Sequence, residues 1–141
     1  MFQVFAIDKI PENLESLKSE CPNIHTICLD LSNWQATREA VQKITPIQLL
    51  VNNAGIALLA PALEAKEEEV DFLFNINLKP VMNITQVVCN DLVKRDLKGS
   101  VVNLSSITGH RAFKDFIIYG PAKAALDMMT KVILIIVNSV L

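Results

Sequence analysis

Two residues near the C-terminal end of the sequence could exchange a proton with a substrate. Tyr119 and Lys123 are four positions apart, so on a helix they share one face about one turn from each other. A free tyrosine has a pKa of about 10, and a lysine ammonium held nearby favours the phenolate. The pair therefore indicates a general acid with Tyr119 as the donor, although an ordinary amphipathic helix shows the same spacing.

Other small or polar residues follow apolar runs. Ser106 comes thirteen residues before Tyr119, where its hydroxyl could donate to a carbonyl oxygen as charge builds there. The run 52–55, Asn-Asn-Ala-Gly, would let a flat ring approach the backbone, and it also fits an ordinary turn. Asn77 lies among apolar neighbours, which is consistent with either a catalytic amide or a structural one that bonds to the backbone.

The residues just described need a scaffold, and the apolar pattern predicts one. Short apolar runs rich in β-branched residues predict buried strands at 2–7, 24–29, 47–51 and 100–104. Segments of helical period lie between them, at 11–18, at 34–44 with Asn33 as a cap, and at 66–97. Pro80 should begin a second helical segment within 66–97 or kink it, and a further helix should start near Tyr119.

The alternation of strand and helix predicts an α/β fold. We expect one domain over residues 1–141, a doubly wound parallel sheet with helices on both faces, since the strands are apolar on consecutive residues. In such sheets a ligand lies beyond the carboxyl ends of the strands. Polar and small residues come directly after the predicted strands, as chemistry at that edge would require.

Composition excludes several other classes of function. A net charge of -2 over 141 residues provides no basic patch, so a nucleic-acid partner is not expected. The C-terminal apolar run is far shorter than the roughly 20 residues that cross a bilayer, so no membrane span is expected. Cys21, Cys28 and Cys89 show no metal or redox spacing and predict a reducing, cytoplasmic location, while His25 and His110 lack metal-ligand spacing and fit surface or loop positions.

The motifs, taken in order, resemble the short-chain dehydrogenase/reductase family. The segments that carry this resemblance are Asn-Asn-Ala-Gly at 52–55, Asn77-Leu78, Val-Asn-Leu-Ser-Ser at 102–106, and Tyr119-x-x-x-Lys123. Nearly the whole chain is similar to the branch that reduces L-xylulose, dicarbonyls and related ketones. The resemblance implies a Rossmann-like fold and an oxidoreductase that uses a nicotinamide cofactor.

The resemblance also implies residue roles. Tyr119 would protonate the carbonyl oxygen while the nicotinamide delivers hydride to the carbon. Lys123 would lower the pKa of the tyrosine and bind the nicotinamide ribose, Ser106 would position the carbonyl, and Asn77 would hold a water that relays protons to Lys123. No metal is implied.

A further set of positions is implied for the cofactor, in addition to Tyr119 and Lys123. They fall at the adenine side and at the floor beneath the cofactor, and comprise Asp30, Leu31, Asn52, Ala54 and Gly55. Asp8 and Lys9 occupy the two positions that choose between cofactors, since an acid there favours NAD and a base favours NADP. NADP(H) is the narrow preference, and Asp8 keeps NAD(H) open.

The sequence also departs from the family pattern. Its glycines are Gly55, Gly99, Gly109 and Gly120, so no glycine-rich turn lies near the start, and residues 2–7 match the family's second strand. Without a first strand, the strands at 2–7 and 47–51 would each lack a neighbour unless they pair directly. Residues 137–140 resemble a further strand that arrives early, and Gly120-Pro121 is unusual inside the Tyr-Lys turn.

Three hypotheses follow from this pattern. The first is an NADP(H)-dependent carbonyl reductase, a homo-oligomer (dimer or tetramer) in its full-length form. Ile107, Phe113 and Phe116 would make part of its pocket apolar, and they equally fit the core packing of a loop. The second is an incomplete, catalytically inactive fragment that associates with full-length subunits through the 66–97 region. The third, another Rossmann-like protein such as a sugar-nucleotide epimerase or a methyltransferase, leaves the 52–55 motif and Ser106 unexplained.

Overall fold

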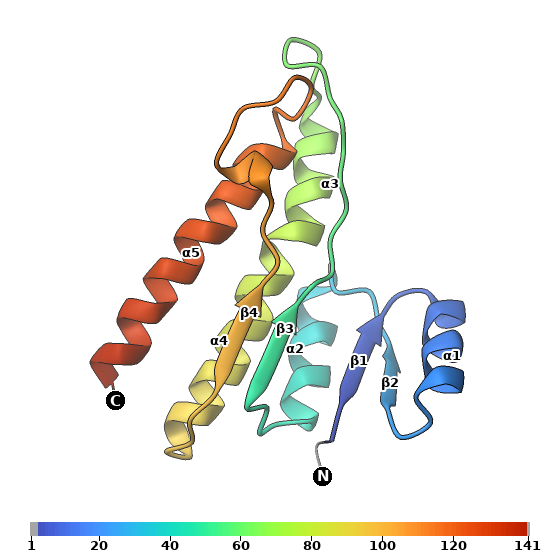
Figure 1. The fold of residues 1–141 in the computed structure, drawn as a ribbon, viewed down its shortest axis with the longest axis vertical. Coiled ribbons are helices and arrows are strands. Elements are labelled where there is room, and N and C mark those ends of the chain that lie inside the picture. Colours follow the sequence, from blue (N-terminus) through green and yellow to red (C-terminus); the bar gives the residue numbers. More distant parts are fainter. Residues whose placement is uncertain (1–2, 141) are drawn as a thin grey trace.

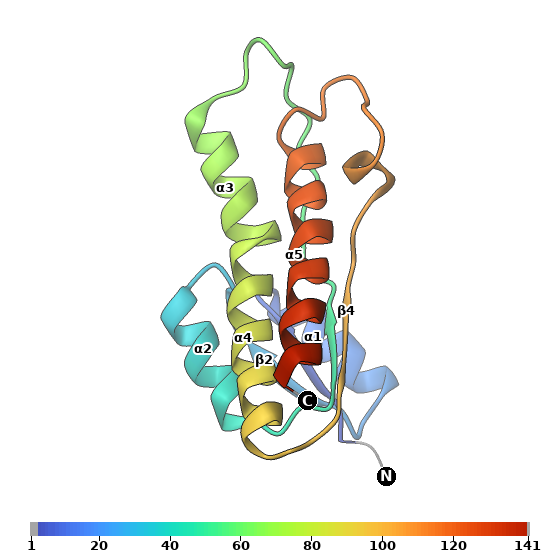
Figure 2. The ribbon, with the colours of Figure 1, turned by 90° about the vertical axis from the view of Figure 1, so that its left-hand side faces the viewer.

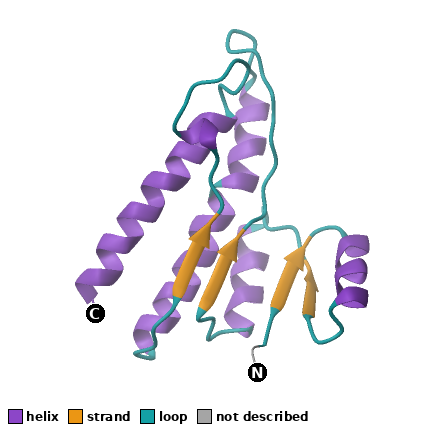
Figure 3. Cartoon of the chain, viewed as in Figure 1, coloured by secondary structure: helices purple, strands orange, loops and turns teal. Residues whose placement is uncertain are grey.

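The computed structural model describes residues 3–140, with side chains described as far as Leu134. Its strands are β1 (Phe5–Asp8), β2 (His25–Cys28), β3 (Leu49–Asn52) and β4 (Ser100–Asn103). Its helices are α1 (Pro11–Glu20), α2 (Trp34–Lys43), α3 (Glu67–Asn77), α4 (Lys79–Lys94), the short 3-10 helix η1 (Ile107–Gly109) and α5 (Tyr119–Val140). Strands and helices alternate as predicted, and Figure 3 shows the strands side by side with helices packed against them.

The strands form two parallel pairs. β1 pairs with β2 from Phe5–His25 to Asp8–Cys28, and β3 pairs with β4 from Leu49–Ser100 to Asn52–Asn103. Within residues 3–140 no ladder joins β1 to β3, although the two strands run in the same direction (Figure 1). The order is therefore that of a doubly wound sheet, 3-2-1-4-5-6, with its central strand and its last strand missing from the described part.

The unjoined edges of β1 and β3 expose backbone polar groups. In a parallel ladder alternate residues bond to one neighbour, and the bonds from His25 N to Val4 O and from Ser100 N to Gln48 O set that alternation. The peptide groups that point away from β2 and β4 are those of Phe5, Ile7, Leu49 and Val51.

Helices lie on both sides of the strands, as expected for this fold. α2, α4 and α5 occupy one side, and α1 lies on the other, against β1 and β2 (Figure 2). The main core lies between α2 and α4, where Val41 packs with residues Ile84, Val87, Val88 and Leu92. On the face of β3 and β4 opposite α4, the side chains of Leu49, Val51 and Val102 are 64%, 60% and 53% exposed, because no described helix covers them.

The helix boundaries follow local chemistry. Asn33 caps α2 by accepting a hydrogen bond from the backbone N–H of Ala36 at 3.0 Å, as predicted. The predicted break before Pro80 is also confirmed, because α3 ends at Asn77 and α4 begins at Lys79 with the proline in its first turn. No helix among the described residues combines the length and apolar character needed to cross a membrane.

The resemblance of residues 137–140 to a further strand is fortuitous. These residues continue α5, which runs without a break from Tyr119 to Val140. Their β-branched residues favour strands only weakly, whereas extending an existing helix adds one backbone hydrogen bond for each residue fixed. No proline or glycine interrupts the helix after Pro121.

Candidate active site

The residues that the sequence singled out gather at one edge of the strands. All four strands run in the same direction, so Asp8, the start of the 52–55 segment and the Ser106 turn all follow carboxyl ends (Figure 1). α5 begins on the same side and brings Tyr119 and Lys123 next to β4. The topology therefore assembles a single candidate site from four separate segments.

Lys123 is the most buried charged side chain of this site, with 6% of its surface exposed. Its Nζ donates a hydrogen bond to the carbonyl oxygen of Leu104 at 2.7 Å and lies 5.7 Å from the centre of the Tyr119 ring. Burial lowers the pKa of Lys123 below its ordinary value, and the Asp127 carboxylate opposes this by raising it. The ammonium is thus held beside the tyrosine, as the four-residue spacing predicted.

Tyr119 is the first residue of α5 and packs in the second core with Leu73, Ile118 and Ala122. Its ring centre lies 5.7 Å from that of Phe116. A Cβ atom on Gly120 would lie 2.9 Å from the backbone oxygen of Thr108, so only glycine allows this first turn of α5 to approach η1 so closely. The unusual Gly120 is therefore explained by close packing.

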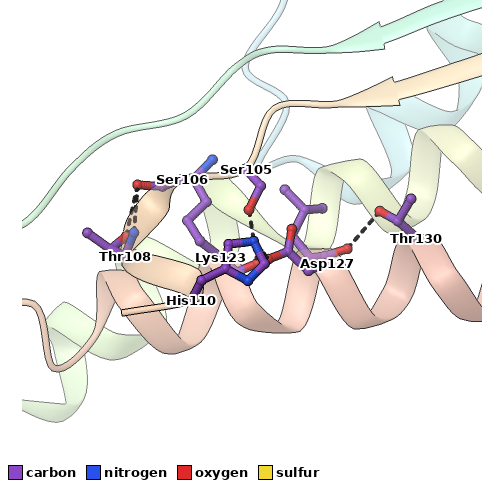
Figure 4. A network of polar contacts seen from close by, with 8 residues as sticks. Ser105, Ser106, Thr108, His110, Lys123, Asp127 and Thr130 are labelled. Carbon is purple, nitrogen blue, oxygen red and sulfur yellow. Dashed lines mark hydrogen bonds and ion pairs between the residues drawn. The ribbon is translucent and has the colours of Figure 1, made fainter. Parts of the chain in front are cut away.

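Ser106 caps η1. Its Oγ accepts hydrogen bonds from the backbone N–H of Thr108 at 3.2 Å and from the Thr108 hydroxyl at 3.0 Å (Figure 4). These two bonds fix the orientation of Oγ and leave its own hydroxyl proton free of any hydrogen bond among the described residues. The serine is therefore oriented and able to donate.

Asn77 is buried, with 1% of its surface exposed, and both ends of its amide bond to one residue. Its Oδ1 accepts from the backbone N–H of Ile56 at 2.8 Å, and its Nδ2 donates to the carbonyl oxygen of Ile56 at 2.7 Å. A Cβ on Gly55 would lie 3.2 Å from Asn77 Oδ1 and 3.8 Å from Lys123 Nζ. Asn77 therefore fixes the segment after β3 beside the lysine, and its predicted water relay stays a prediction.

The 52–55 segment separates into a buried and an exposed part. Asn52 is buried and donates to Thr85 Oγ1 at 3.2 Å and to Asn103 Oδ1 at 2.8 Å, so its side chain ties β3 to α4 and β4. Ala54 and Gly55 are exposed beyond the end of β3. The exposed part provides a small, flat surface, while the Asn52 side chain points into the protein.

The predicted adenine-side residues lie at the carboxyl ends of β1 and β2. Asp8 accepts from the backbone N–H of Ile10 at 2.9 Å and from Asn13 Nδ2 at 3.2 Å, and these hydrogen bonds lower the pKa of its carboxyl. Asp30 accepts from the backbone N–H of Ser32 at 2.9 Å, which lowers its pKa, and the charge of Lys9 lowers both. Both carboxylates are therefore ionised with Lys9 nearby.

Leu31 has a different environment from Asp30, although the two are adjacent. It is half-buried and packs against the core between α2 and α4. Its side chain therefore contributes to packing, and a contact with an adenine ring stays a prediction. Among the described residues no group of three or more His, Cys, Asp and Glu side chains is arranged to hold a metal ion.

Sequence reasoning missed one contact at this site. His110, expected as a surface or loop residue without a partner, follows η1 with 63% of its side chain exposed, and its Nε2 lies 3.2 Å from Oδ2 of Asp127 on α5 (Figure 4). Seventeen residues separate the two in sequence, so no local spacing could have paired them. Gly109 also lies close to Asp127, because a Cβ atom added to this glycine would be 3.0 Å from Asp127 Oδ2.

The parallel strand pairs with helices on both faces define a doubly wound class of α/β protein, and comparison with known proteins is consistent with this. A family model described as short chain dehydrogenase matches residues 2–135. The chain belongs to the short-chain dehydrogenase family.

Several individual proteins are similar to this chain over most of its length. The chain is 43% identical over 128 residues to L-xylulose reductase of Mesocricetus auratus, covering 91% of this chain and 52% of that protein. It is 39% identical over 129 residues to carbonyl reductase [NADPH] 2 of Sus scrofa, covering 92% and 53%. A closed form of serine dehydrogenase complexed with NADP+ superposes with a TM-score of 0.82 at 30% identity, over 90% of this chain and 53% of that one. The chain spans about half the length of the curated relatives it matches.

Proposed function

We propose that this protein is an oxidoreductase that reduces a carbonyl group to an alcohol with NADPH, with Tyr119 as the general acid. The observation that carries the proposal is the buried Lys123 ammonium, 5.7 Å from the Tyr119 ring, beside an oriented Ser106 hydroxyl at the carboxyl ends of the strands. The similarity to L-xylulose reductase and to carbonyl reductase [NADPH] 2 supports a ketone or dicarbonyl as the substrate.

The residues fit a nicotinamide cofactor at both of its ends. Ala54 and Gly55 provide an exposed surface of small residues next to Lys123. A side chain larger than that of glycine at position 55 would be crowded, because its Cβ would lie 3.2 Å from Asn77 Oδ1. Asp8 and Lys9 provide a polar edge at the adenine side. The described residues include no glycine-rich turn for the pyrophosphate between these ends.

Each side chain then has a defined role. When bound, the reduced nicotinamide supplies the hydride that adds to the carbonyl carbon. Tyr119 donates its phenolic proton to the carbonyl oxygen, and Ser106 donates a hydrogen bond to that oxygen as negative charge develops on it. Lys123, with Nζ 5.7 Å from the Tyr119 ring centre, stabilises the resulting phenolate with its positive charge and would also bind the ribose. One hydride and one proton together convert the carbonyl to the alcohol.

The direct test is NADPH oxidation by the purified protein with a small dicarbonyl such as 2,3-butanedione, followed at the nicotinamide absorbance band. Turnover that depends on both protein and dicarbonyl supports the proposal. Cofactor binding is measured in parallel by the change in nicotinamide fluorescence. A chain that binds neither NADPH nor NADH would rule the proposal out for this protein and leave the inactive-fragment hypothesis.

Cofactor preference is expected to change when Asp8 loses its charge. An ionised carboxylate repels the 2′-phosphate of NADPH, and a like charge at about 4 Å costs roughly 1 kcal/mol even in bulk water. Asp8→Ser should therefore tighten NADPH binding by about fivefold relative to NADH. Fluorescence titration of both cofactors measures this ratio, with Glu12→Ser as a control for net charge nearby. An unchanged ratio would show that Asp8 does not oppose NADPH.

Burial of Lys123 predicts how folding stability changes with pH. Because burial lowers the pKa of Lys123 in the folded chain, the unfolded chain binds more protons between that lowered value and the ordinary 10.5. Stability from this residue therefore rises with pH across this window, by at most about 1.4 kcal/mol per pH unit. Urea unfolding of wild type and Lys123→Met between neutral pH and the ordinary lysine pKa measures the difference.

Lys131→Met provides the matched control, since Lys131 is exposed on the same helix. The gap in stability between wild type and Lys123→Met should change steadily with pH, in favour of wild type as the pH rises. The gap for Lys131→Met should stay constant. Parallel curves for all three proteins would contradict the assigned cause.

Aromatic residues beside Tyr119 favour apolar carbonyl substrates over sugars alone. Ala60 N donates to Asp115 O at 2.8 Å and thereby holds Phe116 next to Tyr119, and the ring of Phe113 packs on Phe116 with centres 6.4 Å apart. Phe113 is exposed, so a bound apolar group could cover it. Ile107, also predicted for the pocket, is exposed on η1.

Phe113→Ser should lower kcat/KM for an aromatic diketone by about tenfold and leave that for L-xylulose nearly unchanged, because only the first substrate loses apolar contact. Steady-state kinetics with both substrates measures the ratio. Leu134→Ser, at an exposed apolar position on α5, is the control. Equal losses for both substrates would show that Phe113 supports the fold and does not select the substrate.

We further propose that the protein acts as a homo-oligomer, a dimer or tetramer, through α3 and α4. Exposed apolar side chains on these helices support this, namely Val70, Phe72, Met82 and Val93. A cytoplasmic location is consistent with Cys21, Cys28 and Cys89, which form no disulfide among the described residues.

A further inference from the structure

We propose that Asp127 is a positioning residue of the candidate site with two effects. Its carboxylate provides the negative charge that stabilises the Lys123 ammonium one turn earlier on the same helix. Its ion pair with His110 also holds η1, the turn that begins at Ser106, against α5. The two contacts are independent of the proposed function, but their effect on catalysis rests on it. We thus assign a role to two residues, Asp127 and His110, that had no predicted role from the sequence.

The position of the Asp127 carboxylate is unusual for an acidic side chain. It lies one helical turn after Lys123, with 20% of its side chain exposed. Its Oδ2 is buried and is the one buried side-chain oxygen or nitrogen among the described residues without a hydrogen bond. A buried carboxylate oxygen normally needs a donor, and the group within reach is Nε2 of His110 at 3.2 Å.

The backbone around this contact leaves no room for a different arrangement. A Cβ on Gly109 would lie 3.0 Å from Asp127 Oδ2 and 3.1 Å from the backbone N of Ala124, and a Cβ on Gly120 would lie 2.9 Å from Thr108 O. η1 therefore rests directly on α5 along its length. Ser106 begins this turn, so its Oγ is held relative to Tyr119 by the way η1 packs on α5.

His110 closes the contact at the end of the turn opposite Ser106. The turn itself is short, with backbone hydrogen bonds from Gly109 N to Ser106 O and from His110 N to Ile107 O, both at 3.0 Å. A three-residue turn has little stability of its own and depends on side-chain contacts to stay in place. The ion pair with Asp127 supplies such a contact whenever the His110 ring is protonated.

Asp127 provides the negative charge that compensates the buried Lys123 ammonium, because the other elements packed around Lys123 contribute none. β4 contains no ionisable residue, and the buried residues of α3 and α4 are all uncharged. From η1 and the segment after it, the ionisable group that reaches Asp127 is His110. A buried ammonium without a compensating charge is disfavoured, so removing Asp127 should lower the pKa of Lys123 further.

The test follows the Lys123 side chain and the η1 backbone directly, without using turnover. In Asp127→Asn, the pKa of Lys123, followed by NMR of the labelled lysine side chain, should fall below its value in the wild type. Asp127→Glu keeps the charge and should restore most of the shift. Asp91→Asn, on the surface of α4, is the control for net charge and should leave Lys123 unchanged.

Hydrogen exchange tests the second contact. At about pH 5.5, where an ordinary histidine is protonated, His110→Ala and Asp127→Asn should speed amide exchange at Gly109 and His110 by roughly two- to fivefold. His110→Gln, which keeps a donor near the same position, should exchange more slowly than His110→Ala. His110 is largely exposed, so its variants should keep the fold.

An unchanged Lys123 pKa in Asp127→Asn, or unchanged exchange in both variants, would overturn the corresponding half of the inference. The result is also separable from the proposed function. If the chain neither binds nor oxidises NADPH while both readouts change as expected, the proposed function fails and the coupling through Asp127 holds. If NADPH is oxidised and neither readout changes, the proposed function stands and Asp127 is not a positioning residue.

Discussion

Tyr119→Phe should reduce kcat for NADPH-dependent carbonyl reduction by about 10²- to 10⁴-fold, the range for loss of a positioned general acid. The phenyl ring keeps the packing of Tyr119 against Phe116 and in the second core, so only the hydroxyl is removed. Lys123 retains its hydrogen bond to Leu104 O, because the tyrosine hydroxyl takes no part in it. The loss should therefore appear in kcat, and the affinity for cofactor should stay within about twofold of wild type.

Steady-state NADPH oxidation with a dicarbonyl measures the effect, and fluorescence titration measures cofactor binding. A circular dichroism spectrum and a thermal melt that match the wild type confirm that the variant is folded. Phe5→Leu is the control, since it removes an aromatic ring that packs on His25 at the β1–β2 pair and not on the proton donor. A Tyr119→Phe variant that keeps a tenth or more of wild-type kcat would contradict the role of general acid.

Asn77→Leu should cost about 2–4 kcal/mol of folding stability, because it leaves both the N–H and the carbonyl oxygen of Ile56 without their partner in a buried position. Leucine has the same branched side-chain skeleton as asparagine, so the substitution leaves no cavity and removes the polar groups. The midpoint of urea unfolding, with an unchanged slope, measures it.

The comparison variant is Asn75→Leu, which changes the same residue type on the same helix at a half-buried position. No side-chain hydrogen bond of Asn75 is among those of the described residues, so its loss should stay below about 1 kcal/mol. Equal destabilisation by the two variants would show that the clamp on Ile56 contributes nothing of its own. Rescue by Asn77→Asp would not be expected, since a carboxylate cannot donate to the Ile56 carbonyl.

Local chemistry allowed much of the scaffold to be predicted. The start of α2 follows from an asparagine whose side chain can cap it, and the break between α3 and α4 follows from the ring of Pro80. The strands were placed within a few residues because short apolar runs with β-branched residues stand out from helical periodicity. The fortuitous likeness of residues 137–140 to a strand has the same origin, since β-branched residues in a continuing helix look like a strand.

The candidate site was predicted unevenly. Lys123 and Tyr119 come together as the four-residue spacing requires, because a helix fixes that geometry locally. The His110–Asp127 contact depends on how η1 packs against α5, which is a tertiary property that neither segment encodes alone. The hydrogen bonds by which Asn52 connects β3 to β4 and α4 could not be predicted either, because its partners lie far away in sequence.

The two strand pairs carry different parts of the candidate site, and this has a consequence for ligand affinity. Asp8 and Asp30 belong to the β1–β2 pair, whereas Tyr119 and Lys123 accompany the β3–β4 pair. Among the described residues no backbone ladder joins the pairs, so they are connected through side chains, with Ile7 of β1 and Leu50 of β3 both packing against the core between α2 and α4. A dinucleotide that reaches both ends must immobilise this joint, and the entropy lost in doing so is subtracted from its binding free energy. Packing between α2 and α4, far from either end of the ligand, thus helps to determine how tightly it is bound.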